Sequence, residues 1–115
     1  MSDYQIVHVG INAKTMEEGR RGAALISALF NLPVRETPTA SIVDGIAEFA
    51  AFPRYGAYGH IGIGVKDVEA EMERLEKLGV EFDQESVKKN EEGRISFIFL
   101  KTEVLGFGIH LNRIP

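Results

Sequence analysis

The order of hydrophobic and polar positions divides the chain into two similar halves. Residues 8–11 read His-Val-Gly-Ile and residues 60–63 read His-Ile-Gly-Ile, and a predicted helix follows each segment within a few residues. Three short strand candidates follow each helix, so the order strand, helix and three strands occurs twice. Neither half is large enough to bury a core well by itself. We therefore expect the halves to pack side by side, with one sheet continuing into the next.

The first half is predicted over about residues 5–52. Thr15 and Glu18 form a capping box that begins a helix, and Asn31 followed by Pro33 ends it. Three strands are predicted after the helix, over about residues 34–38, 40–44 and 46–52.

The second half is predicted over about residues 59–113 and follows the same plan. Asp67 is a good N-cap for its helix, and Gly79 takes the usual left-handed position at the helix end. The charged segment 84–94 is interpreted as a long exposed loop or an irregular hairpin with a lid role, and its run 88–92 as a solvated loop. Strands are predicted over about residues 81–87, 95–101 and 107–113, and residues 52–59 form the connector between the halves.

Strand alternation places all three histidines of the chain on one side of the predicted sheet. Successive residues of a strand face opposite ways, so His8, His60 and His110 all face away from the helices. The small residues beside them leave space. The residues of the first strand that are expected to meet the helix are Val7, Val9 and Ile11.

Glu48, in the last strand of the first half, is the counterpart of His110 in the last strand of the second. Imidazole and carboxylate groups are good ligands for Zn, Ni, Fe and Mn, and a mixed nitrogen and oxygen set suits an open catalytic site. The candidate metal ligands are therefore His8, Glu48, His60 and His110. The alternative is that these are polar residues of a concave face that bind nothing. A slip of one residue in register would also turn Glu48 to the other face.

The chain resembles the vicinal oxygen chelate superfamily, which includes glyoxalase I, bleomycin-resistance proteins and extradiol dioxygenases. The resemblance covers about residues 5–113. It implies an α+β fold in which two βαβββ modules form a cup-shaped mixed sheet, often stabilised by a homodimer. More loosely, the chain is similar to small glyoxalase-like proteins associated with the keto-hydroxyglutarate and keto-deoxy-phosphogluconate aldolases. The motifs that carry the resemblance are His8-Val-Gly-Ile11, His60-Ile-Gly-Ile-Gly-Val65 with Asp67-Val-Glu following, Leu78-Gly-Val-Glu-Phe82 and Gly106-Phe-Gly-Ile-His-Leu111.

The resemblance implies metal ligands in the first and last strands of each module, at His8, Glu48, His60 and His110. Members that resemble glyoxalase carry a glutamate at the last position, which also moves the substrate proton, whereas this chain has His110 there. A histidine can both ligate and act as a base, so His110 and Glu48 are the candidate catalytic residues. Because of this difference at position 110, glyoxalase I activity itself is not predicted. Glu48 also lies in the wrong module for the extradiol dioxygenase pattern.

Three functions remain open at this point. The first is a lyase or isomerase that depends on a divalent metal, uses no organic cofactor and acts on a small oxo or hydroxy compound. The second is a metal-free protein of the bleomycin-resistance type that binds a small molecule. The third is an accessory domain of a sugar-acid aldolase pathway. In the first two, the expected partner is a small molecule.

Composition and charge exclude other classes of function. The chain has 115 residues, of which 44% are hydrophobic and 26% charged, which is typical of one globular domain. It has no cysteine, so disulfides and thiolate metal sites are excluded. The net charge of −4, with no long basic run, argues against a nucleic-acid partner. No apolar stretch is long enough to span a membrane and no secretion signal is recognisable, so we expect a cytoplasmic protein.

Several other polar residues have a functional and a structural interpretation. Arg94 and Arg113 are candidates to hold a substrate carboxylate, although solvated surface explains them as well. Tyr55 and Tyr58 are candidates for an aromatic wall around a substrate, although such residues more often pack a connector against a sheet. Asn12 and Asn112 are candidates to orient a ligand residue, and polarity at the sheet edge explains them equally.

Overall fold

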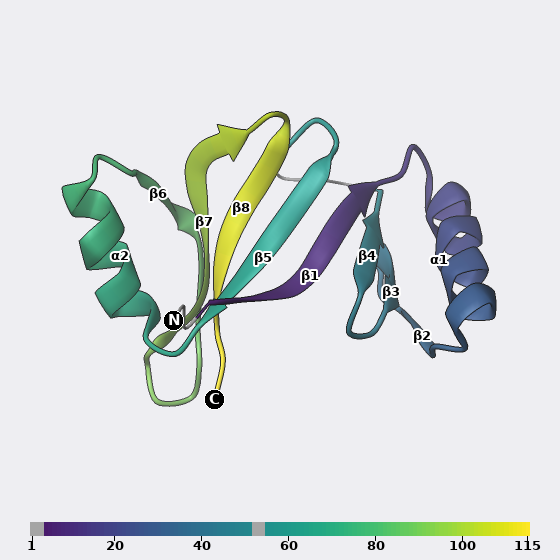
Figure 1. Cartoon of the computed structure of the whole chain (residues 1–115), viewed down its shortest axis with the longest axis horizontal. Coiled ribbons are helices and arrows are strands. Elements are labelled where there is room, and N and C mark those ends of the chain that lie inside the picture. The colour runs from purple at the N-terminus through teal and green to yellow at the C-terminus, as the bar shows by residue number, and fades with distance from the viewer. Residues whose placement is uncertain (1–3, 52–54) are drawn as a thin grey trace.

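One mixed sheet of eight strands carries two helices in the computed structural model, which describes residues 4–51 and 55–115 (Figure 1). The predicted α+β class is confirmed. The elements are β1 (Gln5–Asn12), α1 (Met16–Phe30), β2 (Val34–Glu36), β3 (Ala40–Val43), β4 (Ala47–Ala50), β5 (Gly59–Val65), α2 (Val68–Lys77), β6 (Phe82–Lys89), β7 (Ile95–Val104) and β8 (Phe107–Arg113).

The sheet has the strand order β2-β3-β4-β1-β5-β8-β7-β6, so each half of the chain contributes four neighbouring strands. Within each half the first and last strands pair in parallel, as β1 with β4 and as β5 with β8. The two halves join through the antiparallel pair of β1 and β5. The two predicted βαβββ modules are therefore present, and their first strands form the seam between them.

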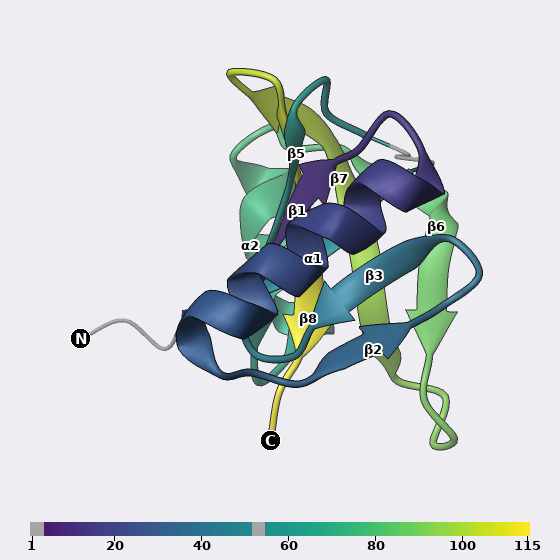
Figure 2. The same ribbon diagram turned by 90° about the vertical axis from the view of Figure 1, so that its right-hand side faces the viewer.

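The helices lie at opposite ends of the sheet, and each packs on strands of its own half (Figure 1). Helix α1 contacts β3 and β4, and Figure 2 shows it running beside the ribbon of β3. Helix α2 contacts β7 and β8. Among the described residues, no helix is long and apolar enough to cross a membrane.

The core of the second half is the larger one. Val68 and Met72 of α2 pack against Ile98 of β7 and Leu111 of β8. The core of the first half is built from smaller residues around Phe49.

The helix ends follow the predicted capping signals. The Thr15 hydroxyl accepts a hydrogen bond from the backbone N–H of Glu18 at 3.0 Å, and Asp67 accepts one from Ala70 at 3.0 Å. Asn31 and Gly79 take left-handed backbone conformations, with φ of 54° and 93°. Local chemistry therefore fixes where both helices begin and end.

The charged segment 84–94 is an irregular hairpin, the second of its two predicted forms, and the long exposed loop is wrong. Strand β6 continues to Lys89, and only residues 90–94 form the turn to β7. The Asn90 side chain accepts hydrogen bonds from the backbone N–H groups of Glu92 and Arg94, both at 3.0 Å. Of the six charged residues of this segment, Glu85, Lys88 and Lys89 thus lie on a paired edge strand, and the other three lie in the turn.

Glu69, in the first turn of α2, ties this helix to β7 and β8. Its carboxylate accepts hydrogen bonds from Arg94 at 3.2 Å, from the backbone N–H of Ile95 at 2.8 Å and from Arg113. The two arginines that were candidates for a substrate carboxylate therefore bind a carboxylate of the protein. Partial burial alone would raise the pKa of Glu69, but these hydrogen bonds hold it at about 2.

We predict that Glu69→Gln lowers the free energy of unfolding by about 1 kcal/mol at neutral pH, since solvent screens these partly exposed ion pairs. Because folding depresses the pKa of Glu69, its contribution is present above the ordinary value of 4.5 and is lost as the pH falls toward 2. Urea unfolding at a series of pH values measures the difference, which should shrink below pH 4.5. Glu73→Gln is the matched control, because among the described residues Glu73 forms only an exposed ion pair with Lys77. An equal loss in both variants would contradict the assignment.

Candidate functional site

The three histidines meet on one face of the sheet, at the seam between the two halves. Cross-strand pairing places His110 of β8 opposite Gly62 of β5, and Gly62 in turn opposite His8 of β1. Two residues further along these strands, His60 of β5 lies opposite Gly10 of β1. The predicted convergence of His8, His60 and His110 is therefore what the pairing produces.

Glycines make room for two of the imidazole rings. A Cβ atom at Gly10 would lie 2.0 Å from Cε1 of His60, and one at Gly62 would lie 2.6 Å from Cε1 of His110. Contacts this short are not possible, so any side chain at either position would displace the ring opposite. The repeated His-x-Gly spacing of the sequence thus supplies both a polar group and the space for its neighbour.

The ring nitrogens of the three histidines lie close enough to share one ion. The Nε2 atom of His8 lies 3.0 Å from Nε2 of His60 and 3.1 Å from Nε2 of His110. One ligand atom of each residue lies within 4.8 Å of the others. Two nitrogens on a tetrahedral zinc ion at about 2.0 Å would lie roughly 3.3 Å apart, so the observed spacing is near that of a metal site.

The placement of hydrogens on the ring nitrogens also favours a cation between them. Nδ1 of His110 lies 2.5 Å from the Asn112 side-chain oxygen, which can only accept, so this nitrogen carries the hydrogen. Nε2 of His110 then has a free lone pair directed at His8. A single N–H on His8 can point at only one of its two Nε2 neighbours. A shared cation would satisfy all three nitrogens at once.

Burial keeps the three histidines neutral. It is the largest cause that lowers the pKa of His8 and of His60, and it outweighs the attraction of the nearby Glu48 carboxylate. Burial, followed by the repulsion that His8 and His60 would exert when protonated, lowers the pKa of His110 to about 3. His110 is 1% exposed. Neutral imidazole is the form that binds a metal ion.

Glu48 lies on the same face but further from the centre. It sits on β4 opposite Gly10, and its Oε1 atom is 3.9 Å from Nε2 of His60. The side chain is 29% exposed, so solvent or a ligand can reach it. The register predicted for Glu48 is the one observed. The structure brings the three histidines together and leaves this carboxylate beside them.

Val7 was expected to face the helix, and that prediction is wrong. The register of β1 against β5 shifts between Ile6 and His8, which is a β-bulge. The bulge turns Val7 to the histidine face, where its methyl groups lie over Gly62 and Gly64. Ile6 takes the other face instead, opposite Ile63. Val7 therefore helps to close the floor of the site beside His8.

Aromatic rings form one wall of the site, and sequence reasoning missed two of them. The rings of Phe97 and Phe99 have centroids 4.5 and 5.1 Å from that of His110. Tyr55, which was a candidate for such a wall, packs on Phe99 with centroids 5.0 Å apart. The residues from 95 to 100 had been interpreted as one buried strand. Alternation within that strand was the signal that could have placed both phenylalanines beside His110.

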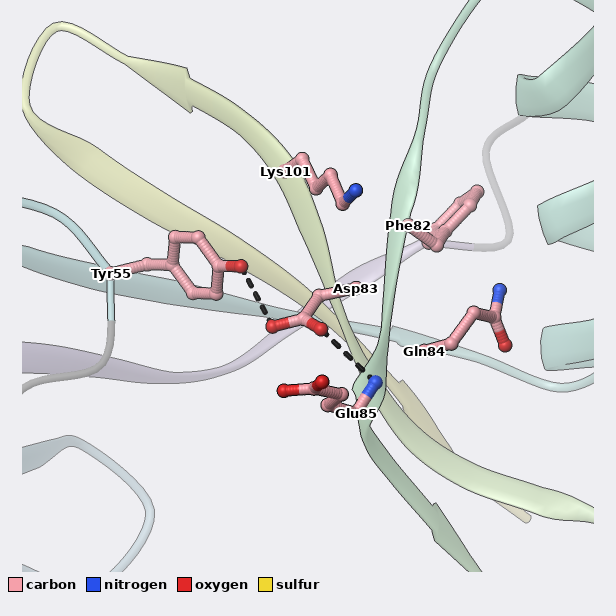
Figure 3. A pocket seen from close by; sticks show the side chains of 6 residues that line it. All are labelled: Tyr55, Phe82, Asp83, Gln84, Glu85 and Lys101. Atoms are coloured by element: carbon pink, nitrogen blue, oxygen red, sulfur yellow. Dashed lines mark hydrogen bonds between the residues drawn. The ribbon is translucent and has the colours of Figure 1, made fainter.

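A pocket of about 610 Å³ continues this wall away from the histidines (Figure 3). Asp83 of β6 lies opposite Phe99, which lies opposite His110, so the pocket extends the same row of the sheet. The Tyr55 hydroxyl donates to the Asp83 carboxylate at 2.7 Å, and the backbone N–H of Glu85 donates to it at 3.0 Å. The pocket is lined by Tyr55, Phe82, Asp83, Gln84, Glu85 and Lys101.

Comparison with known proteins finds solved structures of similar architecture. No family model and no curated protein match the chain. Methylmalonyl-CoA epimerase in complex with methylmalonyl-CoA and ammonium has a TM-score of 0.65 at 16% identity, over 96% of this chain and 94% of that one. A Streptomyces coelicolor methylmalonyl-CoA epimerase variant in complex with 2-nitronate-propionyl-CoA also has a TM-score of 0.65 at 16% identity, over 99% and 100%. A hypothetical protein from Bacillus halodurans C-125 has a TM-score of 0.65 at 14% identity, over 99% and 96%.

The chain has the vicinal oxygen chelate fold. The methylmalonyl-CoA epimerases belong to that superfamily, and their likeness extends over nearly all of both chains. The predicted cup of two βαβββ modules is thereby confirmed. At 14–16% sequence identity, the similarity to these structures shows the fold alone. None of these three structures is described as associated with an aldolase, so that association remains a prediction.

We predict that Gly10→Ala destabilises the protein by about 1–3 kcal/mol, because the new methyl group overlaps the His60 ring. The same substitution should cost much less in a His60→Ala background, where the ring is gone. Urea unfolding of the four proteins gives the coupling between the two positions. An equal cost of Gly10→Ala in both backgrounds would show that the ring is not what the glycine accommodates.

Proposed function

We propose that His8, His60 and His110, with Glu48 beside them, bind a divalent metal, and that the site catalyses a lyase or isomerase reaction on a small oxo or hydroxy compound. The observation that supports this proposal is the cluster of three neutral imidazoles whose ligand atoms lie within 4.8 Å of one another. A cation is the best partner for these three buried imidazoles to share.

The donor set suits the metals expected from the sequence. Three imidazole nitrogens with a carboxylate oxygen nearby suit Zn, Ni, Fe or Mn. Asn112 holds His110 through its Nδ1 hydrogen, which is the usual support for a ligating histidine. When bound, the metal would supply Lewis acidity toward neighbouring oxygens of the ligand.

We assign proton transfer to Glu48 and ligation alone to His110. His110 is almost fully buried, its Nδ1 atom is engaged by Asn112, and its pKa of about 3 makes it a weak base. Glu48 is partly exposed and is the one carboxylate of the four groups. A carboxylate that reaches the ligand while the imidazoles stay fixed is suited to move a proton on a carbon next to a carbonyl.

An isomerase is favoured within this class because two of the structural neighbours are epimerases. Those proteins were crystallised with CoA derivatives. We carry over from them the type of reaction and not the substrate. The expected homodimer and the association with sugar-acid aldolases remain predictions.

A second candidate is a metal-free binding protein of the bleomycin-resistance type. The pocket next to the histidines favours it, because Tyr55 and Phe82 supply aromatic surface while Asp83 and Glu85 supply carboxylates. Such a lining suits an aromatic or cationic ligand. Under this alternative the histidines would bind no metal, and a cationic aromatic compound would raise the melting temperature.

Metal analysis of protein purified without a histidine tag tests the first proposal. We predict one zinc or nickel ion per chain, and loss of at least 100-fold in affinity in His60→Ala, measured by calorimetric titration. Asn112→Ala should weaken binding by about 10–100-fold, because it leaves the ligands but frees the His110 ring. Glu85→Gln, in the neighbouring pocket, is the matched control and should bind as tightly as the wild type. Circular dichroism verifies that each variant is folded.

Substoichiometric metal in the wild type, with no change in His60→Ala, would refute the metal site and favour the binding protein.

A further inference from the structure

Strand β6 is strongly bulged beside the histidine site. Asp83 pairs with Phe99 and Lys88 pairs with Phe97, so six residues of β6 stand opposite three residues of β7. The buried Ser86 holds the irregular segment in place. Its hydroxyl donates to the Asp83 carbonyl at 2.7 Å and accepts from the backbone N–H of Phe99 at 2.8 Å. Bulges of this kind commonly redirect a side chain near a functional site.

The bulge directs Lys88 onto the histidine face. Lys88 lies directly opposite Phe97, and its Nζ atom is 4.9 Å from the centroid of the Phe97 ring. The other neighbour of that ring is His110, at 4.5 Å between centroids. The Lys88 ammonium group and the His110 ring therefore contact the same aromatic ring.

Lys88 has no carboxylate partner within the part of the chain that the structure describes. Arg35, Arg74, Arg94 and Arg113 each pair with an aspartate or glutamate there, whereas Lys88 has only the face of Phe97.

We propose that Lys88 is the anion-binding residue of the histidine site, so that the ligand is a small 2-oxo or 2-hydroxy carboxylate. The proposal rests on the proposed metal site. The carboxylate would lie beside Lys88, and the carbon chain would lie against Phe97 and Phe99. A carboxylate next to a carbonyl or hydroxyl group supplies the neighbouring oxygens that such a site takes.

The charges around the cluster agree with an anionic ligand. Three neutral histidines and the single carboxylate of Glu48 do not neutralise a divalent ion, and Lys88 adds a further positive charge. Glu48 and Lys88 also lie on opposite sides of the three strands that carry the histidines, since β4 adjoins β1 on one side and β6 lies beyond β7 on the other. A ligand held by Lys88 would thus present the carbon next to its carboxylate toward Glu48.

Oxalate binding to zinc-loaded protein tests this assignment. Oxalate is a probe that carries carboxylate oxygens on neighbouring carbons. We predict that Lys88→Gln weakens oxalate binding at least tenfold in calorimetric titration, which is about the contribution of one charge-assisted hydrogen bond. Lys88→Arg should keep most of the affinity. Lys89→Gln, the adjacent residue on an exposed edge, is the matched control and should bind oxalate as the wild type does. Zinc content measured after each titration verifies that oxalate has not removed the metal.

The arms of the experiment separate the two proposals. Equal oxalate affinity in wild type and Lys88→Gln, at full zinc occupancy, would overturn the role of Lys88 and leave the metal site standing. If the wild type binds no metal, the proposed function fails. The role of Lys88 is then tested by titrating oxalate into the metal-free protein. Binding that is lost in Lys88→Gln would support its role as an anion site, and binding unaffected by the substitution, or absent from the wild type, would overturn it.

Discussion

The site depends on a steric constraint at the seam of the sheet, where glycines stand opposite histidines. His60 fills the space above Gly10, and His110 fills the space above Gly62, at distances that leave no room for a Cβ atom. Because β1 and β5 pair across the boundary between the modules, this constraint also joins the two halves. The imidazoles are held by close packing as well as by hydrogen bonds, and they meet without help from a loop.

Burial at this seam determines the protonation state of the three histidines that meet there. Taken out of water, the histidines lose their affinity for protons and are ready to bind a cation at neutral pH. The charged groups remain at the margins, with Glu48 on the side of the first module and Lys88 on the side of the second. The arrangement separates ligation in the buried centre from acid–base and anion-binding roles at the accessible rim.

Local sequence patterns were sufficient to predict the elements, their caps and the face on which the histidines lie. Alternation has a fixed period, and the repeat of the order strand, helix and three strands limits the topology. The errors come from bulges, because a register shift depends on hydrogen bonds between segments distant in sequence. Val7 changed face at the bulge in β1, and the bond from Phe99 to Ser86 redirects Lys88. Neither event has a signal within the strand concerned.

The most direct test of the account is the anomalous diffraction of a crystal grown with zinc, measured at the zinc absorption edge. The account predicts one strong peak at the seam, within about 2.0–2.2 Å of the Nε2 atoms of His8, His60 and His110. It also predicts that Asn112 still bonds Nδ1 of His110. Three histidines that remain in mutual contact, with no peak between them at saturating zinc, would contradict it.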